Sequence, residues 1–377
     1  MDARPIYTSG VTPSLKNLDW RSFLARPQLT PPTPHRLDAL KQEPILITGA
    51  GGSIGSALAL RLAAVGAARL VLLEASESNL YALQRDWADS GAPGSMTPVL
   101  GSVADRALLQ EIFSTHRPGI VFHAAAFKHV PLMEEQPLAA MANNIFATET
   151  LAQVAAAHGA RVVLLSTDKA VEPASVMGAT KRVAEQIVLA AGGTVLRLGN
   201  VLASRDSVAE VFARQIEQGG PLTVTGPTAR RYFLALDEAV NLLLGAALHP
   251  ETGTLLAPVL PATHSIAEMA RFMAQALKPA SAIPIEFTGP RSGDKETELL
   301  WKTGELACPA GQDGMVQVET DPLPGTQLES RLAGLRAALE VRDIAEALDA
   351  LRALVPDYAP SGAVLKLAHE CGPRVCL

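Results

Sequence analysis

Short apolar runs and helical segments alternate regularly along the chain from residue 44 to about residue 204. Continuous apolar runs that alternate with helices are typical of buried strands in a parallel sheet with helices on both faces. We therefore predict an α/β fold, a Rossmann-like doubly wound parallel sheet, over residues 39–204. The runs occupy residues 45–48, 69–74, 97–101, 119–124, 161–166 and 194–199, with helices at 53–65, 77–89, 105–115, 138–158 and 178–191.

The alternation becomes irregular after residue 205. We predict that residues 205–377 form a smaller α/β substrate-binding region with C-terminal helices. The pattern leaves open whether residues 237–260 return to the main sheet. The expected elements are a helix at 207–218, a strand at 222–225, a loop at 230–232, helices at 237–248 and 264–278, strands at 253–259 and 283–287, and terminal helices near 326–340 and 343–354.

Residues 1–38 are rich in proline and contain one short apolar patch at 18–24. Proline interrupts helices and central strands, so this stretch does not have the pattern of a folded domain. We interpret it as an N-terminal arm that packs on the domain or on a neighbouring subunit.

Composition narrows the class of protein. Hydrophobic residues make up 48% of the chain and charged residues 19%, which is enough apolar material for a large core. The net charge of −6 gives no electrostatic attraction to nucleic acid or to an anionic membrane. Three cysteines, at 308, 371 and 376, lack metal-ligand spacing, so we expect neither a disulfide framework nor a metal site. With no signal peptide and no run long enough to span a membrane, we expect a cytoplasmic protein.

A glycine-rich turn follows the first predicted strand. Gly49, Gly52 and Gly55 stand in a Gly-x-x-Gly-x-x-Gly pattern between that strand and a helix, with Thr48, Ser53 and Ile54 beside them. Glycines let backbone N–H groups approach a pyrophosphate at the positive end of a helix. Alone, the triplet is equally compatible with an ordinary strand-to-helix turn. The alternating strands and helices around it favour a dinucleotide site.

Three further residues bear on the identity and placement of the dinucleotide. Glu74 closes the second strand, where a carboxylate accepts hydrogen bonds from ribose hydroxyls and repels a 2′-phosphate, which favours NAD over NADP. A solvated acid at a strand end is the plainer alternative. Ser102 and Val103 follow the third strand near the expected adenine, although an acidic residue is the usual contact there.

The fourth strand ends in three small residues, Ala124, Ala125 and Ala126, beside which a flat ring system can lie close to the backbone. Lys128 and His129 follow at the carboxyl edge of the sheet, where ligands of such folds bind. An exposed basic loop is the alternative interpretation.

The fifth strand ends in Thr167, Asp168 and Lys169, and Met177 and Lys181 follow one helical turn apart. A hydroxyl, a carboxylate and an amine at the carboxyl end of a strand are candidates for acid–base chemistry. The alternative is that Asp168 caps the next helix and Lys169 is solvated.

The motifs taken together resemble the extended short-chain dehydrogenase/reductases and, among them, the CapD-like nucleotide-sugar 4,6-dehydratases. The resemblance covers residues 18–300. Two departures stand out: Met177 replaces the tyrosine common in the superfamily, and the N-terminal membrane helices of the long members are missing. The motifs are Thr-Gly-x-x-Gly-x-x-Gly (48–55), His-Ala-Ala-Ala-x-Lys-His-Val (123–130), Ser-Thr-Asp-Lys-Ala (166–170), Gly-Ala-Thr-Lys (178–181), Arg-Leu-Gly-Asn-Val-Leu-x-Ser-Arg (197–205) and Arg-x-Gly-Asp-Lys (291–295).

This resemblance implies NAD as cofactor, UDP-N-acetylglucosamine as substrate and loss of water across carbons 5 and 6. Transient oxidation at carbon 4 makes the carbon 5 proton acidic, and the hydride returns to carbon 6. Members with Met at this position resemble the enzymes that retain the carbon 5 configuration. For the diphosphate and uridine the family points to Asn200, Ser207, Arg231, Arg291 and Lys295.

By position, Thr167 holds the carbon 4 oxygen, and Lys181 binds the nicotinamide ribose and stabilises nearby negative charge. Asp168 and Lys169 share removal of the carbon 5 proton and protonation of the leaving hydroxyl, with Lys169 a neutral base if a dry site lowers its pKa. The thioether of Met177 is a weak acceptor and cannot be the base.

Two other functions stay open. A UDP-sugar 4-epimerase uses the same loop and lysine but returns the hydride to carbon 4. A non-catalytic NAD-binding sensor or scaffold accounts for Met177. We expect a homo-oligomer in either case.

Overall fold

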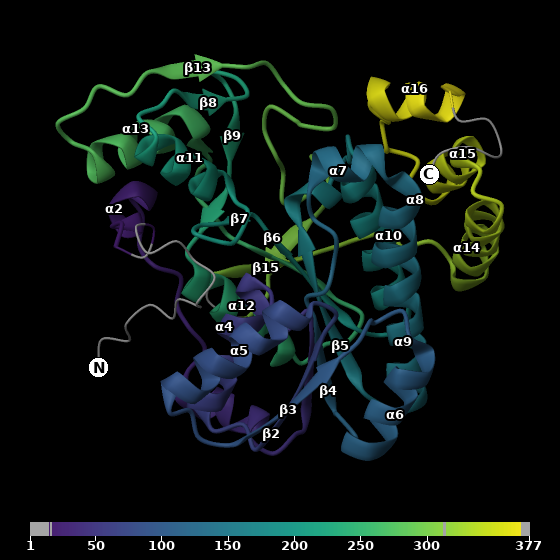
Figure 1. Cartoon of the computed structure of the whole chain (residues 1–377). Coiled ribbons are helices and arrows are strands. Elements are labelled where there is room, and N and C mark those ends of the chain that lie inside the picture. The colour runs from purple at the N-terminus through teal and green to yellow at the C-terminus, as the bar shows by residue number, and fades with distance from the viewer. Residues whose placement is uncertain (1–14, 16, 312–313, 371–377) are drawn as a thin grey trace.

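A nine-stranded sheet runs through the centre of the molecule (Figure 1). The structure, a computed structural model, describes residues 15, 17–311 and 314–370. The strand order is β14-β15-β11-β6-β5-β4-β1-β2-β3, and the strands from β11 to β3 are parallel. Their bounds are β1 Ile45–Thr48, β2 Arg69–Glu74, β3 Ser95–Leu100, β4 Ile120–His123, β5 Arg161–Thr167, β6 Thr194–Leu198, β11 Leu255–Pro258, β14 Ala307–Pro309 and β15 Met315–Val318.

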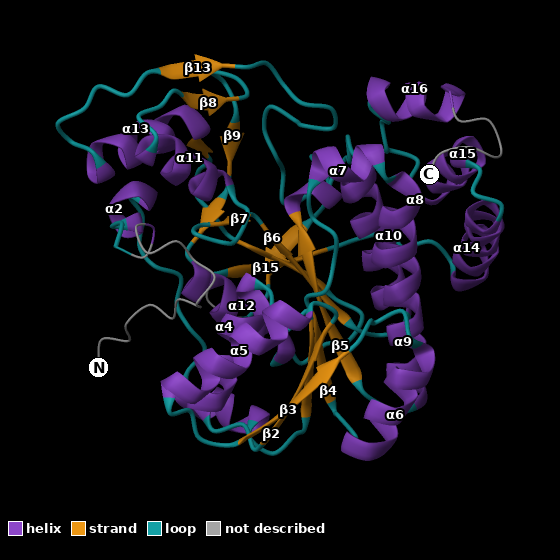
Figure 2. Ribbon diagram, viewed as in Figure 1, coloured by secondary structure: helices purple, strands orange, loops and turns teal. Residues whose placement is uncertain are grey.

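Helices cover both faces of this sheet (Figure 2). Within β1, Ile45 and Ile47 pack against one helical layer and Leu46 against the other, because successive strand side chains point to opposite faces. The sheet is therefore buried on both sides, which explains the uninterrupted apolar runs and confirms the predicted fold class. One layer consists of α4 Ser53–Val65, α5 Glu77–Ser90 and α12 Leu236–Ala247, and the other of α6 Arg106–His116, α9 Ala147–Ala157 and α10 Val176–Ala190.

The predicted long helix at 138–158 is wrong in detail. The segment consists of α8 (Pro137–Met141), a π-helical turn (Ala142–Phe146) and α9, and an additional helix, α7 (Val130–Glu135), precedes it. Pro137 lacks the N–H that would continue α7, so the chain breaks there and begins a new helix. The π-helical turn contains neither proline nor glycine, so no helix breaker marked it in the sequence.

The sheet also contains strands from the second half of the chain. Strand β11 pairs in parallel with β6, so residues 255–258 do return to the main sheet. Strand β15 then pairs antiparallel with β11, and β14 with β15. The sequence analysis missed both, because three- and four-residue strands beside loops carry too little alternation to be recognised.

A small lobe sits beyond the carboxyl ends of the central strands (Figure 1). It has its own apolar cluster, centred on Phe212, Leu222 and Met273. Two pairs of two-residue strands connect it to the sheet domain, so the loop expected at 230–232 is partly wrong: Arg230 and Arg231 pair with His264 and Ser265. The lobe and its connections comprise α11 Val208–Glu217, α13 Ile266–Leu277, β8 Leu222–Val224, β13 Ile285–Phe287, β7 Asn200–Val201, β10 Phe233–Leu234, β9 Arg230–Arg231 and β12 His264–Ser265.

The N-terminal arm packs on this lobe of its own chain. Trp20 and Leu24, on the short helix α2 (Trp20–Leu24), are buried in the lobe's apolar cluster. Arg26 then forms a buried two-point ion pair with Glu238 of α12, at 2.7 Å to each carboxylate oxygen. The arm continues through α3 (Pro34–Leu37) and a 3₁₀ turn (Asp38–Leu40) into β1; residues 1–14 lie outside the described chain.

Three C-terminal helices lie at the other side of the molecule: α14 Gly325–Glu340 and α15 Ile344–Leu354 pack against α10, and α16 Gly362–Glu370 packs against α7 and α15. Their apolar side chains share one cluster with Met177 of α10. None of the helices within residues 17–311 and 314–370 combines the length and hydropathy needed to cross a bilayer. Residues 371–377, which include Cys371 and Cys376, are not described.

Candidate active site

The glycine loop packs directly on the loop that follows β4. Gly49 has φ of +65°, and a Cβ there would lie 2.7 Å from the Cα of Ala125. A Cβ on Gly55 would lie 2.2 Å from the carbonyl oxygen of Gly49. Backbone contacts this close exclude any side chain, so both glycines are required for the turn to bring its N–H groups to the start of α4.

Replacing Gly55 with alanine is expected to displace the loop and to lower dinucleotide affinity by at least about tenfold, because a backbone shift must absorb the overlap. Isothermal titration with NAD measures the effect. Gly334→Ala in α14 is the matched control, since nothing lies within 4 Å of a Cβ there. Unchanged affinity of the Gly55 variant would contradict the assignment of this loop as the dinucleotide site.

Glu74 closes β2 beside the glycine loop. Its carboxylate accepts hydrogen bonds from the backbone N–H of Gly51 at 2.9 Å and of Ser76 at 2.9 Å. These bonds fix the carboxylate and leave each oxygen one lone pair for a ribose hydroxyl. Glu74 therefore keeps acceptor capacity beside the glycine loop, and its contact with a ribose stays a prediction.

A buried hydrogen-bond chain supports the floor of this region. His123 contacts the Thr48 hydroxyl through Nδ1 at 2.7 Å and the Thr148 hydroxyl through Nε2 at 2.9 Å. Burial, together with the nearby charge of Lys181, lowers the pKa of His123 to about 3. The ring is therefore neutral and structural. Thr48, predicted as a cofactor contact, is fully buried here and supports the loop from behind.

Asn144 is a residue that the sequence analysis missed. It lies in the π-helical turn and pairs with both backbone groups of Phe127: its Oδ1 accepts from the N–H at 2.8 Å, and its Nδ2 donates to the carbonyl at 3.0 Å. Nδ2 also donates to the Thr180 hydroxyl on α10. Asn144 thus connects the loop after Ala124–Ala126 to the helix that carries Lys181. An asparagine pair inside an apolar helix was the only sequence signal.

The hydroxyl, carboxylate and amine at the end of β5 do meet. The Thr167 hydroxyl donates to Asp168 Oδ1 at 2.9 Å, and Lys169 Nζ donates to the same oxygen at 3.0 Å. Lys169 Nζ also donates to Asn200 Oδ1 at 3.1 Å. An ammonium group has three donors, so one N–H of Lys169 stays available to a ligand.

Asp168 is completely buried, and its Oδ2 has no hydrogen-bond partner among the residues that the structure describes. An unpartnered buried carboxylate oxygen is costly and marks a place where a further donor fits. Lys169 beside it keeps about a fifth of its side chain exposed, at 22%. The pair therefore joins a buried carboxylate to an amine that is partly open to solvent.

Met177 and Lys181 both lie on α10, as expected. Met177 is 4% exposed and packs in the apolar cluster beneath the C-terminal helices, so its thioether supports the helix. Lys181 is 5% exposed. Burial lowers the pKa of Lys181 to about 8, although the Glu185 carboxylate acts in the opposite direction.

A buried ion pair holds α10 against β5 and β6. Glu185 accepts from Arg197 at 2.9 and 2.8 Å and from the Ser166 hydroxyl at 2.6 Å. Burial would raise the pKa of Glu185, but the charge and hydrogen bonds of Arg197 outweigh it and bring the pKa down to about 2. Ser166 directly precedes Thr167, so this pair fixes the strand end from which the acid–base residues project.

The loop at 289–298 lies over this strand end. Lys295 Nζ donates to the Val171 carbonyl at 2.8 Å and forms an ion pair with Glu298 at 2.6 Å. Arg231 is 8% exposed, and its guanidinium donates to the carbonyls of Lys295 and Glu296 at 2.8 and 2.9 Å. Arg291 lies apart from both, exposed and paired with Asp294 at 2.8 Å.

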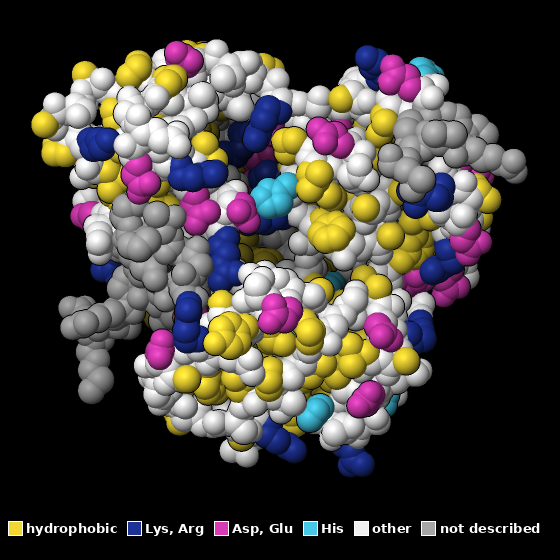
Figure 3. All heavy atoms as spheres, in the orientation of Figure 1, with side chains coloured by type: hydrophobic (Ala, Val, Ile, Leu, Met, Phe, Trp, Pro, Cys, Tyr) yellow, Lys and Arg dark blue, Asp and Glu magenta, His cyan; other side chains and the backbone are white. Residues whose placement is uncertain are grey.

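The other predicted contacts lie around the opening between the small lobe and the sheet domain. Figure 3 shows the surface hollowed there, with Lys, Arg and His side chains at the rim. Lys128 Nζ donates to the Arg205 carbonyl at 2.6 Å, and His129 Nε2 is 3.9 Å from Asp206 Oδ2. Burial lowers the pKa of both Lys128 and His129. Ser207 begins α11, and its hydroxyl has no partner within the described chain.

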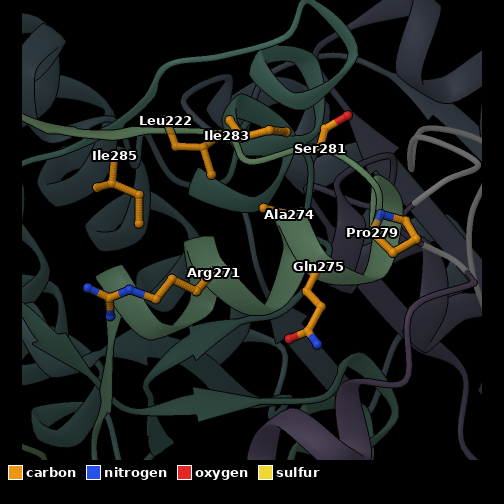
Figure 4. Close-up of a pocket in the computed structure, with 8 residues that line it drawn as sticks. All are labelled: Leu222, Arg271, Ala274, Gln275, Pro279, Ser281, Ile283 and Ile285. Carbon is orange, nitrogen blue, oxygen red and sulfur yellow. The ribbon is translucent and has the colours of Figure 1, made fainter.

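On the adenine side, Ser102 accepts a hydrogen bond from the Ala104 N–H at 3.1 Å and Val103 is 7% exposed within the core. Ile54 is partly buried beside the glycine loop. A surface depression of about 370 Å³ lies elsewhere, between α13 and strands β8 and β13, and is lined by Arg271, Gln275 and Ile285 among others (Figure 4). It contains none of the predicted residues, and we do not assign it to the site.

Within residues 17–311 and 314–370, no cluster of His, Cys, Asp and Glu could hold a metal ion.

The fold and sequence are similar to those of known proteins. Pen from Bacillus thuringiensis superposes with a TM-score of 0.69 at 28% identity, over 75% of this chain and 89% of Pen. DesIV, a dTDP-glucose 4,6-dehydratase from Streptomyces venezuelae determined with NAD bound, gives a TM-score of 0.59 at 20% identity over 68% of this chain and 87% of DesIV. The second likeness shows the fold alone.

Three curated relatives align over most of this chain. The probable polysaccharide biosynthesis protein EpsC of Bacillus subtilis is 35% identical, over 78% of this chain and 50% of EpsC. The capsular polysaccharide biosynthesis protein CapD of Staphylococcus aureus is 37% identical, over 71% of this chain and 46% of CapD. A UDP-glucose 4-epimerase of Rickettsia rickettsii is 33% identical, over 70% of this chain and 79% of the epimerase.

The chain therefore spans about half the length of EpsC and of CapD. The sequence model of the polysaccharide biosynthesis proteins matches residues 45–319, from β1 through β15. That segment includes the glycine loop, the acid–base residues of β5, helix α10 and the 289–298 loop. This chain belongs to the polysaccharide biosynthesis protein family.

Proposed function

We propose that this protein dehydrates UDP-N-acetylglucosamine to a UDP-4-keto-6-deoxy-N-acetylhexosamine, with NAD as a retained cofactor. The observation that carries the proposal is the Thr167–Asp168–Lys169 group, joined through Asn200 at the carboxyl end of β5. A dehydration needs a proton removed at one carbon and delivered to a hydroxyl on the next. This group offers adjacent sites for both transfers.

The residues present fit a nicotinamide dinucleotide. Gly49 and Gly55 leave no room for side chains where the backbone must approach a pyrophosphate, and Glu74 presents a fixed carboxylate to the ribose. Bound NAD supplies a reversible two-electron acceptor for the carbon 4 position of the sugar. DesIV, which has the same fold, was determined with NAD, and this supports the choice of cofactor.

Thr167 holds the carbon 4 oxygen in this proposal, since its hydroxyl lies beside both proton-carrying groups. Lys181 is placed under the nicotinamide ribose, where its positive charge stabilises negative charge on that oxygen. Met177 takes no part, because its thioether has no transferable proton and is buried in an apolar cluster.

Asp168 and Lys169 share the two proton transfers at carbons 5 and 6. The N–H of Lys169 that no protein group accepts is directed to the sugar, and Asp168 holds the amine in place and exchanges a proton with it. Asn200 fixes the amine from the other side. The proton taken from carbon 5 leaves with the carbon 6 hydroxyl as water, and the hydroxyl proton released at carbon 4 on oxidation takes its place on the Asp168–Lys169 unit. Because this one short hydrogen-bonded unit then protonates carbon 5 from the side on which it was deprotonated, we propose retention of configuration at carbon 5.

The nucleoside diphosphate is proposed to lie under the small lobe, near Lys128, His129, Ser207 and the 289–298 loop. Arg291 is the arginine proposed to turn toward a phosphate, since its own side chain is 59% exposed, although it pairs with Asp294. Arg231 and Lys295 hold the loop by its backbone, so their contribution to binding is to keep that loop over the site.

Turnover of UDP-N-acetylglucosamine by the purified protein tests the proposal. We expect a product that has lost one water and shows a 4-keto-6-deoxy pattern in the NMR spectrum, with no net formation of NADH. Release of NADH in proportion to product would exclude a dehydratase. Loss of water together with an inverted carbon 5 would leave the reaction class intact and overturn only the proposed stereochemistry.

A UDP-sugar 4-epimerase is the second candidate, and the 33% identity to the Rickettsia rickettsii UDP-glucose 4-epimerase favours it. Epimerisation needs no acid at carbon 6, so the Lys169–Asp168 pair would have no proton-transfer role. A product of unchanged mass and altered carbon 4 configuration would establish this alternative.

A further inference from the structure

A four-residue segment, residues 203–206, crosses from the small lobe to the glycine loop; we call it the strap. Its backbone is anchored on both sides: the Arg205 N–H donates to the Ser53 hydroxyl at 2.9 Å, and the Arg205 carbonyl accepts from Lys128 Nζ at 2.6 Å. Ser53 begins α4 and Lys128 follows β4. The strap therefore bridges the two loops between which the dinucleotide is proposed to lie.

The backbone of the strap is strained on both sides of Arg205. Ala203 and Asp206 each have φ of 55°, in the left-handed region of backbone conformation that residues other than glycine rarely adopt. Neither position is occupied by glycine, which would adopt this conformation without strain. Such conformations persist where surrounding contacts hold them, and here they direct Arg205 to the glycine loop.

The Arg205 side chain lies on that loop. Its Nη1 donates to the Gly51 carbonyl at 3.0 Å and to Asn79 Oδ1 at 2.7 Å. Its Nε is buried and has no hydrogen-bond partner among the described residues. A buried guanidinium N–H without an acceptor costs free energy, so this group is placed for an acceptor that the described residues do not supply.

Electrostatics indicate the charge of that acceptor. Arg205 contacts the glycine loop at the N-terminus of α4, where the helix dipole is positive and the first turn contains no acidic residue. The nearby Glu74 carboxylate accepts hydrogen bonds from the N–H groups of Gly51 and Ser76. A cation at a positive helix end is unfavourable unless an anion lies between them.

We propose that Arg205 binds the pyrophosphate of the dinucleotide and that the strap closes over it. The planar guanidinium matches two phosphate oxygens, and the α4 N–H groups contact the same dianion from below. The inference rests on the proposed function, in which one NAD must stay bound through each cycle. The strap accounts for that retention, because the cofactor cannot leave until Arg205 releases the pyrophosphate.

The test compares ligands that contain the pyrophosphate with one that lacks it. In calorimetric titrations of the cofactor-stripped full chain, Arg205→Gln is expected to weaken NAD and ADP-ribose binding by about 10- to 100-fold and to leave adenosine binding unchanged. Radiolabelled NAD should dissociate faster from this variant by a similar factor. Arg205→Lys, which keeps the charge but loses the planar fork, should recover part of the affinity.

Two matched variants separate ligand binding from loop support. Asn79→Ala removes the present partner of Arg205 and should leave NAD affinity within about twofold, since its hydrogen bond is made to the protein. Arg85→Gln, an exposed arginine on α5, should have no effect. If Asn79→Ala weakened NAD as much as Arg205→Gln, or if Arg205→Gln weakened adenosine equally, Arg205 would be a loop support and the inference overturned.

Equal NAD binding by Arg205→Gln and the unaltered protein would overturn this inference alone. Failure of the unaltered protein to bind NAD would overturn the proposed function and this inference with it.

Discussion

Lys169→Met is expected to reduce turnover of UDP-N-acetylglucosamine by about 10²- to 10⁴-fold, the contribution of a positioned acid–base group. The methionine side chain is close in length to that of lysine but carries no proton. Loss of the Lys169 amine leaves buried Asp168 with one hydrogen-bond donor fewer, so neither proton transfer at carbons 5 and 6 has a complete path. Product formation followed by mass spectrometry measures the loss.

A second readout separates chemistry from binding. In D₂O the unaltered protein should place deuterium at carbon 5 of the product, and Lys169→Met should not, even when the substrate KM stays within a few-fold. Lys366→Met on α16 is the control, because that lysine is 74% exposed and forms a surface ion pair with Glu370. Normal turnover with normal deuterium incorporation in the Lys169 variant would show that the proton path runs through other groups.

Lys181→Met is expected to abolish turnover and yet make the protein more stable. Lys181 is 5% exposed, and burial lowers its pKa to about 8 from its ordinary 10.5. At neutral pH the folded state therefore holds a charged amine where a neutral group is preferred. A shift of this size corresponds to about 3 kcal/mol, so removing the amine should raise the free energy of unfolding at pH 7 by up to about that amount.

The lowered pKa of Lys181 also fixes the direction in which the free energy of unfolding changes with pH. Between pH 8 and about pH 10.5 the unfolded chain keeps the Lys181 proton while the folded protein loses it. The unfolded state thus binds more protons, and the free energy of unfolding contributed by this group rises with pH through that window. Below pH 8 both states are protonated and the contribution is constant.

Denaturant unfolding at pH 7 and pH 9.5 compares the two proteins. The difference in stability should be large at pH 7 and smaller at pH 9.5, because the unaltered protein has by then lost the buried charge. Lys366→Met, at an exposed position, should change stability by less than about 0.5 kcal/mol at both pH values. A Lys181 variant that is less stable at pH 7 would mean that the amine is held by contacts that favour its charge.

Much of the sheet domain could be predicted from sequence. The apolar runs of β1, β2, β4, β5 and β6 are continuous because both faces of the parallel sheet are buried, and this signal is local. The glycines at 49 and 55 were informative for a related reason. A Cβ on Gly55 would overlap the backbone of Gly49, a few residues earlier, and a Cβ on Gly49 would overlap the backbone just after the adjacent strand β4. The grouping of Thr167, Asp168 and Lys169 was also local, since the three are consecutive.

Other features depended on residues that are far apart in the chain. Arg205 reaches Gly51 and Asn79, more than a hundred residues away, and nothing in its own neighbourhood indicates that target. The strands β14 and β15 are too short to have a pattern, and only their pairing beside β11 identifies them. The π-helical turn that carries Asn144 likewise contains no proline or glycine that would mark it in the sequence.

The sequence alone determined the parallel sheet, the glycine loop and the candidate acid–base residues, because strand burial and tight turns depend on near neighbours. The tertiary structure decided how the charged side chains are buried and which groups they contact. It placed Arg231 and Lys295 on backbone carbonyls, left Arg291 exposed, buried Lys181 and brought Arg205 onto the glycine loop. Burial and pairing of charged side chains are set by groups from distant segments, and only the folded chain brings those groups together.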